Sequence, residues 1–205
     1  MVRVGGEVLP AGFYARDTAR VARALLGCVL ESRIGGEHTA GRIVEVEAYV
    51  GPHDPAAHGF GNRRTKRNER LFGPPATSYV YFIYGMHWCF NAVTEREGYP
   101  AAVLVRALEP LEGVAAMMQR RRIADERTLC AGPARLCEAL GITGSIDGVS
   151  LLEGPVRIVR ALRYRRVTVD LGPRIGVSKA ASWPLRFVVR GSPWLSRPGP
   201  KRKGA

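Results

Sequence analysis

The sequence predicts a single domain that mixes helices and strands, and three observations lead to this fold class. Its 205 residues suffice for one large domain with a substantial core. A hydrophobic content of 46% and a mean hydropathy of -0.08 are typical of a folded protein rather than a disordered one. Helical and strand patterns alternate with no repeat or composition break that would mark a linker, so one mixed α/β domain is expected.

The amino-terminal half begins with a helix and a hairpin. Residues 16–28 have apolar residues on one helical face, with Asp17 suited to the N-cap and Gly27 to the end. Residues 28–50 predict two strands, with a Gly-Gly pair at the turn between them. Residues 51–77 are rich in Gly, Pro, Asn and Arg and predict a long surface loop of the kind that carries function.

The remaining elements follow in order. Strands are expected within residues 78–94 and 101–110, helices within 111–123 and 131–141, alternating strands and loops over 143–190, and a last strand within 186–194. The second of these helices has Pro133 near its first turn and Gly141 past its end. Residues 1–196 are therefore predicted to be the domain, and residues 197–205 a flexible basic tail that adds affinity for phosphate.

The charge predicts a polyanionic partner. Formal net charge is +13, and of the 31 basic residues four are lysines, which leaves 31 - 4 = 27 arginines. Arginine forks match phosphate geometry and stack on bases, so nucleic acid is favoured. A genome that uses arginine everywhere would give the same composition. Charge alone leaves DNA, RNA and the ribosome open.

Several classes of protein are disfavoured. The four cysteines form no CxxC pair or secreted-scaffold spacing, which argues for reduced thiols rather than a zinc knuckle or a disulfide framework. No apolar run approaches the roughly 18 residues that span a membrane, and the amino terminus has no secretory apolar segment. A cytoplasmic protein without a membrane partner is expected, associated with the nucleoid if the source is prokaryotic.

Two acids and a tyrosine share one face of a predicted strand. In "GRIVEVEAYV" the period of two places Glu45, Glu47 and Tyr49 together, with valines and alanine on the other face. A carboxylate facing a polyanion repels it, so its presence needs a reason. The simplest interpretation for Glu45 is a solvated acid in an ion pair with a nearby arginine. For Glu47 the strand pattern alone does not decide.

The loop after this strand carries histidines and cations. His53, Asp54 and His58 could be read as metal ligands. Their spacing matches no known metal site and no further ligand is seen to converge with them, so no metal is expected. The cationic run "RRTKR", which begins at Arg63 and ends at Arg67, is more simply a phosphate clamp.

Aromatic side chains crowd the next predicted hairpin, "SYVYFIYGMHWCF". Tyr79 and Tyr81 point one way with Ile83, while Val80, Phe82 and Tyr84 point the other way, and Gly85 permits a bend at the tip. An exposed ring at a tip can enter a base stack, and an inward ring can wall a slot for a flat ligand. Core packing is the expected role of three further rings, which are Phe82, Trp88 and Phe90.

At this point five segments resemble the alkyladenine (3-methyladenine) DNA glycosylase family. They are "RIVEVEAYVGPHDPAAH", "YVYFIYGMHWCFN", "VLVRALEPLEG", "LCAGPARLCEALGI" and "PLRFVVRGSPW", in order from about residue 7 to residue 196. The resemblance implies an α+β fold, a single compact domain in which a curved antiparallel sheet with a protruding β-hairpin is surrounded by helices. It also implies hydrolytic removal of alkylated or deaminated purines from double-stranded DNA, without a cofactor.

The resemblance assigns roles position by position. Glu47 resembles the general base that activates the attacking water, and Arg106 and the main-chain carbonyl of Ile175 resemble the groups that orient that water. The predicted pocket for the flipped base contains Tyr49, His58, Tyr81 and Asn91, where His58 also donates to the base and Asn91 crowds an exocyclic amino group. The predicted DNA contacts are Tyr84, which fills the gap in the duplex, with Met86, His87, Arg63, Thr65 and Arg67.

The sequence departs from the family at two places. Relatives commonly carry an aromatic residue after the Gly-Met of the hairpin, where this chain has His87, and residues 145–174 align poorly. A lyase reaction would need an amine nucleophile. Lys66, the one lysine of the motif-rich half, lies in the predicted clamp, so cleavage by a monofunctional, monomeric enzyme is expected.

Two other classes of function fit part of the sequence. A non-catalytic binder of bent or damaged DNA would use Tyr84 and the basic loop but has no use for an acid beside an aromatic slot. An RNA-binding protein would prefer single-stranded or A-form RNA. Both remain as alternatives at this stage.

Overall fold

The computed structural model describes residues 6–161 and 167–200. The strands of this part are β1 Gly6–Val8, β2 Val29–Ser32, β3 Thr39–Tyr49, β4 Ser78–Ile83, β5 His87–Thr94, β6 Ala101–Glu112, β7 Val156–Ala161, β8 Val169–Gly172 and β9 Arg186–Val189. The α-helices are α1 Ala11–Tyr14, α2 Thr18–Leu25, α3 Val114–Arg121, α4 Glu126–Leu129 and α5 Pro133–Leu140. Short 3-10 turns lie at Ile34–Gly36, Phe60–Asn62, Glu69–Phe72 and Gly144–Ile146.

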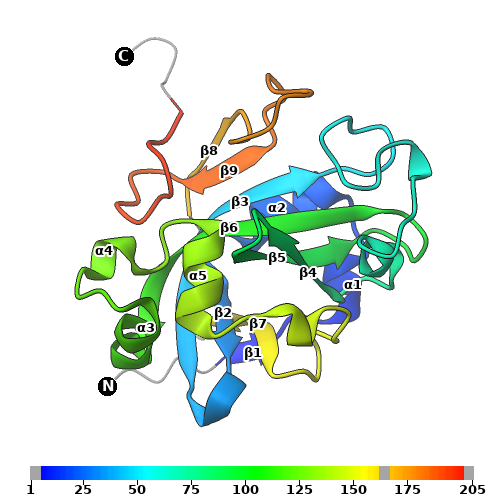
Figure 1. Ribbon diagram of the computed structural model, residues 1–205. Helices are drawn as coiled ribbons and strands as arrows, with labels where there is room; N and C mark the ends of the chain where they lie inside the picture. The colour runs from blue at the N-terminus through cyan, green and yellow to red at the C-terminus, as the bar shows by residue number, and fades with distance from the viewer. Residues whose placement is uncertain (1–5, 162–166, 201–205) are drawn as a thin grey trace.

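The strands form one curled antiparallel sheet, which Figure 1 shows with helices on its flanks. The order is β1-β7-β2-β3-β6-β5-β4, and β9 joins β3 while β8 pairs with β9. The long strand β3 makes this branching possible, because its first part pairs with β2 and residues 45–47 pair with β9. The mixed α+β fold with its hairpin, β4–β5, is as predicted.

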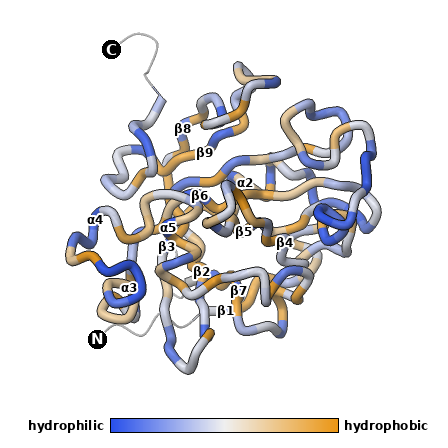
Figure 2. The backbone as a smooth tube through the Cα atoms, viewed as in Figure 1, coloured by the Kyte–Doolittle hydropathy of each residue, from blue (hydrophilic) through white to orange (hydrophobic). Residues whose placement is uncertain are grey.

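The apolar face of the sheet and the helices make the core. Val46 and Val105 on the central strands lie in one cluster with Val21 and Leu25 of α2 and Leu136 of α5. Figure 2 shows hydrophobic residues concentrated on the central strands, with hydrophilic residues on the surrounding loops. The opposite face of β3, β5 and β6 is left for polar side chains, and the segment 51–77 packs over it through Leu71 and Phe72.

The two helices with capping signals form where predicted. Asp17 accepts a hydrogen bond from the main-chain amide of Arg20 and so caps α2. Helix α5 starts at Pro133, and Gly141 ends it with a φ of 70°. These signals are local, so they can be read without knowledge of the tertiary structure.

Helix α3 begins later than predicted. Strand β6 continues past Pro110 to Glu112, and the helix starts only after Gly113, which has a φ of 69°. Pro110 lies opposite Gly41 beside a register shift, a position at which a strand tolerates proline because a regular ladder bond is already interrupted. The elements β1, α1 and α4 were not predicted, since three or four residues carry no readable period.

The three rings assigned to core packing have different environments. Phe90 is fully buried, as predicted, and Trp88 is half-buried. Phe82 is 42% exposed, so its predicted burial is wrong. It packs on Trp88 with ring centroids 4.6 Å apart, on the hairpin face that points away from the polar side of the sheet.

The cysteines and the carboxy-terminal segment complete the fold. All four cysteines are free and buried, which confirms the predicted reduced thiols. Main-chain carbonyls of Arg197 and Pro198 accept hydrogen bonds from Arg186, so the start of the predicted tail packs on β9. Residues 201–205 of that tail lie outside the described residues, and the domain boundary stays a prediction. Among the described helices, none combines the length and the apolar character that crossing a bilayer requires.

Candidate active site

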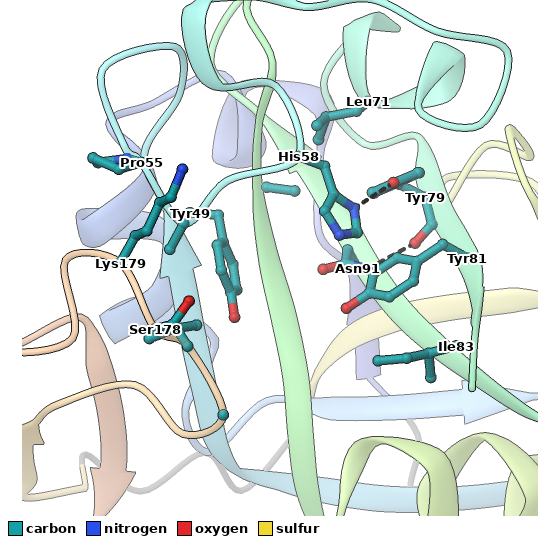
Figure 3. Close-up of a pocket in the computed structure, with 14 residues that line it drawn as sticks. Tyr49, Pro55, His58, Leu71, Tyr79, Tyr81, Ile83, Asn91, Ser178 and Lys179 are labelled. Carbon is teal, nitrogen blue, oxygen red and sulfur yellow. Dashed lines mark hydrogen bonds between the residues drawn. The ribbon is translucent and has the colours of Figure 1, made fainter.

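A cavity of about 340 Å³ opens on the polar face of the sheet. Three segments wall it: the end of β3 with the loop after it, the hairpin β4–β5, and the loop between β8 and β9. Figure 3 shows Tyr49 on one side and His58 with Tyr81 on the other. The volume falls in the range of small-molecule sites.

All four side chains predicted to bind a flipped base line this one cavity. They are Tyr49, His58, Tyr81 and Asn91. His58 and Tyr81 meet edge to face with centroids 4.6 Å apart, which leaves the cavity flanked by flat ring surfaces. The geometry suits a planar ligand, and base binding by these residues remains a prediction.

Glu47 lies behind the cavity rather than on its wall. Its exposed fraction is 0%. Tyr49, which lines the cavity, donates a hydrogen bond from its hydroxyl to Oε2 of Glu47 at 3.0 Å. The main-chain amide of Ile175 donates to Oε1 at 2.7 Å. The Ile175 contact in the structure is thus made by its N–H, whereas the predicted water contact used its carbonyl, which stays a prediction.

Arg106 reaches Glu47 because strand β6 is irregular at this residue. Ala107 lies opposite Glu45 and Val105 lies opposite Val46, so the register steps over Arg106. Such a bulge re-aims a side chain, often beside a functional site. The Arg106 side chain is almost buried, and its Nη1 lies 3.3 Å from Oε2 of Glu47.

The surroundings of Glu47 set its acidity. Burial raises the pKa of Glu47 above its ordinary value, and the charge of Arg106 and the bonds from Ile175 and Tyr49 oppose that rise. The net direction is upward. A buried carboxyl whose pKa is raised toward neutrality is a stronger base than a surface one, which suits it to accept a proton from water.

Tyr79 orients His58, a role that the sequence did not reveal. The Tyr79 hydroxyl lies 2.7 Å from Nδ1 of His58. Burial lowers the pKa of His58, with Arg67 adding to that effect, while burial raises the pKa of Tyr79. Both groups are then neutral, and in the tautomer in which the phenol donates to Nδ1, Nε2 carries the proton and is the donor. The only sequence signal was that Tyr79 shares a strand face with Tyr81.

Asn91 presents an acceptor to the cavity. Its Nδ2 donates to the main-chain carbonyl of Tyr79 at 3.0 Å and to that of Cys89 at 3.4 Å. Figure 3 shows the side-chain oxygen on the cavity side. An amide held in this way has a fixed orientation, so it can select among ligand edges by hydrogen bonding or by contact.

A buried ion pair ties two walls of the cavity together. Asp54 and Arg174 are both fully buried, and Arg174 Nη2 donates to Asp54 Oδ1 at 2.8 Å. Arg174 also donates to the carbonyl of Ala48 at 3.1 Å, and its guanidinium lies 4.7 Å from the ring centre of Tyr49. Asp54, weighed in the sequence as a metal ligand, is therefore occupied by an arginine 120 residues away.

The hairpin tip and the basic loop face solvent beside the cavity. Tyr84 is 82% exposed and Met86 68% exposed, and His87 is exposed as well. Tyr84 has a φ of 54° and Gly85 one of 69°, as in a tight hairpin turn that is costly for a tyrosine. A bulky ring kept in this conformation at a tip indicates a function for the ring.

The predicted phosphate clamp is attached to both the cavity and the hairpin. Arg63, Thr65 and Arg67 are exposed, and Arg67 donates to the carbonyl of Phe82 at 2.9 Å. The buried amide of Asn68, another residue that the sequence did not single out, donates to the carbonyls of His58 and Arg63, both at 2.8 Å. Among the other clamp residues, Arg64 is paired with Glu69.

Lysines lie in two different places relative to the cavity. Lys66 belongs to the exposed clamp loop, as predicted. Lys179, which the sequence argument placed outside the motif-rich half, lines the cavity from the loop between β8 and β9, with Ser178 beside it (Figure 3). Lys179 therefore lies on the cavity wall, whereas Lys66 does not line the cavity.

Comparison with known proteins gives a consistent result. The family model described as methylpurine-DNA glycosylase matches residues 12–193. A protein of Methanoculleus marisnigri, provisionally named a 3-methyladenine DNA glycosylase, is 48% identical over 92% of this chain and 98% of its own. A similarly named protein of Rhodopseudomonas palustris is 47% identical over 96% of this chain and 91% of its own. The DNA-3-methyladenine glycosylase of Homo sapiens is 45% identical over 90% of this chain and 66% of its own.

Proposed function

The chain belongs to the methylpurine-DNA glycosylase family, and we propose that it extrudes alkylated or deaminated purines from duplex DNA and hydrolyses their N-glycosidic bond with a water activated by Glu47. At the coarser level it is a DNA glycosylase of base-excision repair, a hydrolase acting on N-glycosyl bonds. The proposed substrates are 3-methyladenine, 7-methylguanine, hypoxanthine and ethenoadenine. The observation that carries the proposal is a ring-walled cavity in which one ring, Tyr49, is hydrogen-bonded to a buried carboxylate.

The arrangement supports general-base hydrolysis. Glu47 accepts hydrogen bonds from Tyr49 and Ile175 and is ion-paired with Arg106. Two carboxylate oxygens offer about four acceptor sites, so acceptor capacity is left for a water. Contacts in an unliganded catalytic site commonly rearrange in the complex. In this proposal, binding of the nucleotide lets a water reach Glu47 between Tyr49 and the Ile175 backbone. The same negative charge stabilises the oxocarbenium character that develops on the sugar as the bond breaks.

The cavity also accounts for extrusion and choice of base. Taking a purine out of the stack costs a few kcal/mol, least for a poorly paired lesion, and stacking between Tyr49 and the His58–Tyr81 side offsets that cost. Nε2 of His58 donates a hydrogen bond to a neutral leaving base such as hypoxanthine. Asn91, held by two main-chain carbonyls, crowds the exocyclic amino group of guanine.

The direct test uses duplexes that each hold one defined lesion. After incubation with the protein, alkali cleaves the strand at any abasic site, and the length of the product reports base release. Excision of at least one alkylated or deaminated purine is expected. Duplex binding without excision of any lesion would favour the non-catalytic binder, and stronger competition by RNA than by lesion-containing duplex would favour the RNA-binding alternative.

Tyr79→Phe tests the orientation of His58. Without the phenol, Nδ1 of His58 loses its donor and the proton is free to occupy either ring nitrogen. Excision of hypoxanthine, which relies on the Nε2 donor, is expected to fall about tenfold, whereas excision of 7-methylguanine, a cationic base that leaves readily, should change less. Single-turnover rates on the two duplexes measure this, and equal loss on both would contradict the role of Tyr79.

Tyr84→Ala tests the wedge. Removal of the exposed ring at the tip should lower the population of extruded base by about tenfold, on the order of one stacking interaction, and should leave nonspecific affinity nearly unchanged. A duplex with 2-aminopurine beside the lesion reports extrusion by fluorescence. Phe82→Ala is the matched control, because Phe82 is an exposed ring of the same hairpin that does not line the cavity. Similar loss of extrusion in both variants would refute the wedge.

A further inference from the structure

A second buried glutamate lies beside Glu47, the proposed general base. Glu45 is fully buried two residues before Glu47, so the sequence-based interpretation as a solvated acid is wrong, although its pairing with arginine is confirmed. Its carboxylate accepts from Arg106 Nε at 3.0 Å and Arg186 Nε at 2.9 Å. Ser196 adds its main-chain amide at 2.6 Å and its hydroxyl at 2.7 Å. Four donors from β6, β9 and the carboxy-terminal segment thus converge on one carboxylate.

Arg106 is shared between the two carboxylates. Its Nε faces Glu45 at 3.0 Å, and its Nη1 faces Glu47 at the longer distance of 3.3 Å. An unshared arginine prefers to grip a carboxylate with two parallel bonds. Here Nε bonds to Glu45 and Nη2 is directed to the Ser196 hydroxyl at 3.5 Å, so Nη1 alone is directed to Glu47.

We propose that Glu45 is a positioning residue for Glu47. By binding Nε of Arg106, Glu45 keeps Arg106 from pairing fully with the carboxylate of Glu47. This inference rests on the proposed function. Arg186 and Ser196 belong to the same device, because they hold Glu45 in place. The carboxy-terminal segment therefore takes part in setting the basicity of Glu47, from which it is far apart in sequence.

The charges around Glu47 determine in which direction this arrangement shifts its pKa. Facing it are Arg106 from β6, Tyr49 and Glu45 from β3 itself, Cys89 from β5 and the Ile175 amide, while Arg186 of β9 lies opposite it in the register. The negative charge of Glu45 raises the pKa of Glu47 and that of Arg106 lowers it. Removing the charge of Glu45 lowers the pKa of Glu47 for two reasons: the like charge is lost, and Arg106 is released to pair with Glu47.

Glu45→Gln is the first test. Gln keeps the shape and one acceptor but not the charge. The acidic limb of the pH–rate profile, which reports ionisation of the base, is expected to move to lower pH by about one unit. The plateau rate should fall about threefold because the base is weaker. Single-turnover excision of 7-methylguanine across the acidic limb and onto the plateau measures both, and at acidic pH that base is already cationic and needs no protonation to leave.

Ser196→Ala is a milder variant that keeps the charges of both glutamates and of Arg106. The lost hydroxyl donates to Glu45 at 2.7 Å and accepts from Arg106 Nη2 at 3.5 Å. A weaker hold on Glu45 makes it draw Arg106 more strongly, whereas release of Nη2 lets Arg106 turn to Glu47, so the two effects on Glu47 oppose each other. The acidic limb should therefore move much less than in Glu45→Gln.

A control and a second readout complete the design. Glu31→Gln removes another buried glutamate, on β2, which pairs with His38, and should leave the limb unmoved. Titration of the Glu47 carboxyl by ¹³C NMR, with the resonance assigned by its loss in Glu47→Gln, follows the same shifts without any need for activity. Shifts by NMR in a protein that excises nothing would sink the proposed function and support the positioning role. An unmoved or raised limb and resonance in Glu45→Gln, or a downward shift in Ser196→Ala as large as in Glu45→Gln, would overturn the positioning role.

Discussion

Glu47→Gln is expected to release a damaged purine at least about a hundredfold more slowly than the wild type, the range attributed to a general base. The single oxygen of Gln can still accept from the Ile175 amide, and its NH2 can donate to the Tyr49 hydroxyl in place of the bond that Glu47 accepts there. Gln cannot take a proton from water or stabilise a cationic sugar by charge. Arg106 keeps its bond to Glu45, so no buried cation is left without a partner. Single-turnover excision on a duplex with one 3-methyladenine or hypoxanthine measures the effect.

Affinity for the duplex should survive this change. Glu47 is fully buried, and its neutralisation does not remove a phosphate contact. Binding measured by fluorescence anisotropy should therefore match the wild type. Glu109→Gln, a partly exposed acid of β6 paired with Arg42, is the matched control and should excise normally. Wild-type excision by Glu47→Gln would refute the mechanism while leaving the family assignment intact.

Asp54→Ala is expected to destabilise the protein by about 3–5 kcal/mol, the cost of removing one partner of a buried pair. Arg174 would then keep a buried charge without its carboxylate, and two walls of the cavity would lose their connection. For a chain of this size the unfolding midpoint should fall by roughly 6–20 °C. Thermal unfolding followed by circular dichroism measures it, and excision should fall with it because the pocket is no longer held.

An exposed pair provides the comparison. Asp170 and Arg190 are bonded near the surface, where an ion pair contributes at most about 1 kcal/mol. Asp170→Ala should therefore change the midpoint little. The double variant Asp54→Ala with Arg174→Met should recover part of the lost stability, since an apolar replacement of both partners removes the unpaired charge. A loss in Asp54→Ala as small as in Asp170→Ala would show that the buried pair is not what joins the walls.

Local signals explain which parts of the fold were predictable. The cap at Asp17, the glycine after α5 and the period of two in β3 and β4 depend only on neighbouring residues, so these elements lie where expected. Strand β6 ran past Pro110 because its partner strand has a register shift there. Phe82 looked like a core ring because hydrophobicity says nothing about whether another layer covers a hairpin.

The candidate site also has parts that the sequence predicts and parts that it does not. The alternation in "EVEAY" places Glu45, Glu47 and Tyr49 on one face, and the family resemblance names the pocket residues that the structure brings around one cavity. Roles that depend on distant partners were missed: the hydrogen bond from Tyr79 to His58, the pair between Asp54 and Arg174, and the contacts from Asn68. Each joins side chains whose meeting no short motif encodes.

The sequence by itself determined the fold class, the aromatic hairpin, the acid-bearing strand and the basic character of the protein, because periodicity and composition are properties of the chain alone. Only the tertiary structure decided how the charges are shared. A bulge turns Arg106 toward both glutamates, and the carboxy-terminal segment returns to bond Glu45 through Ser196. Burial and distance set the strength of each such interaction, and both depend on how segments far apart in the chain pack together.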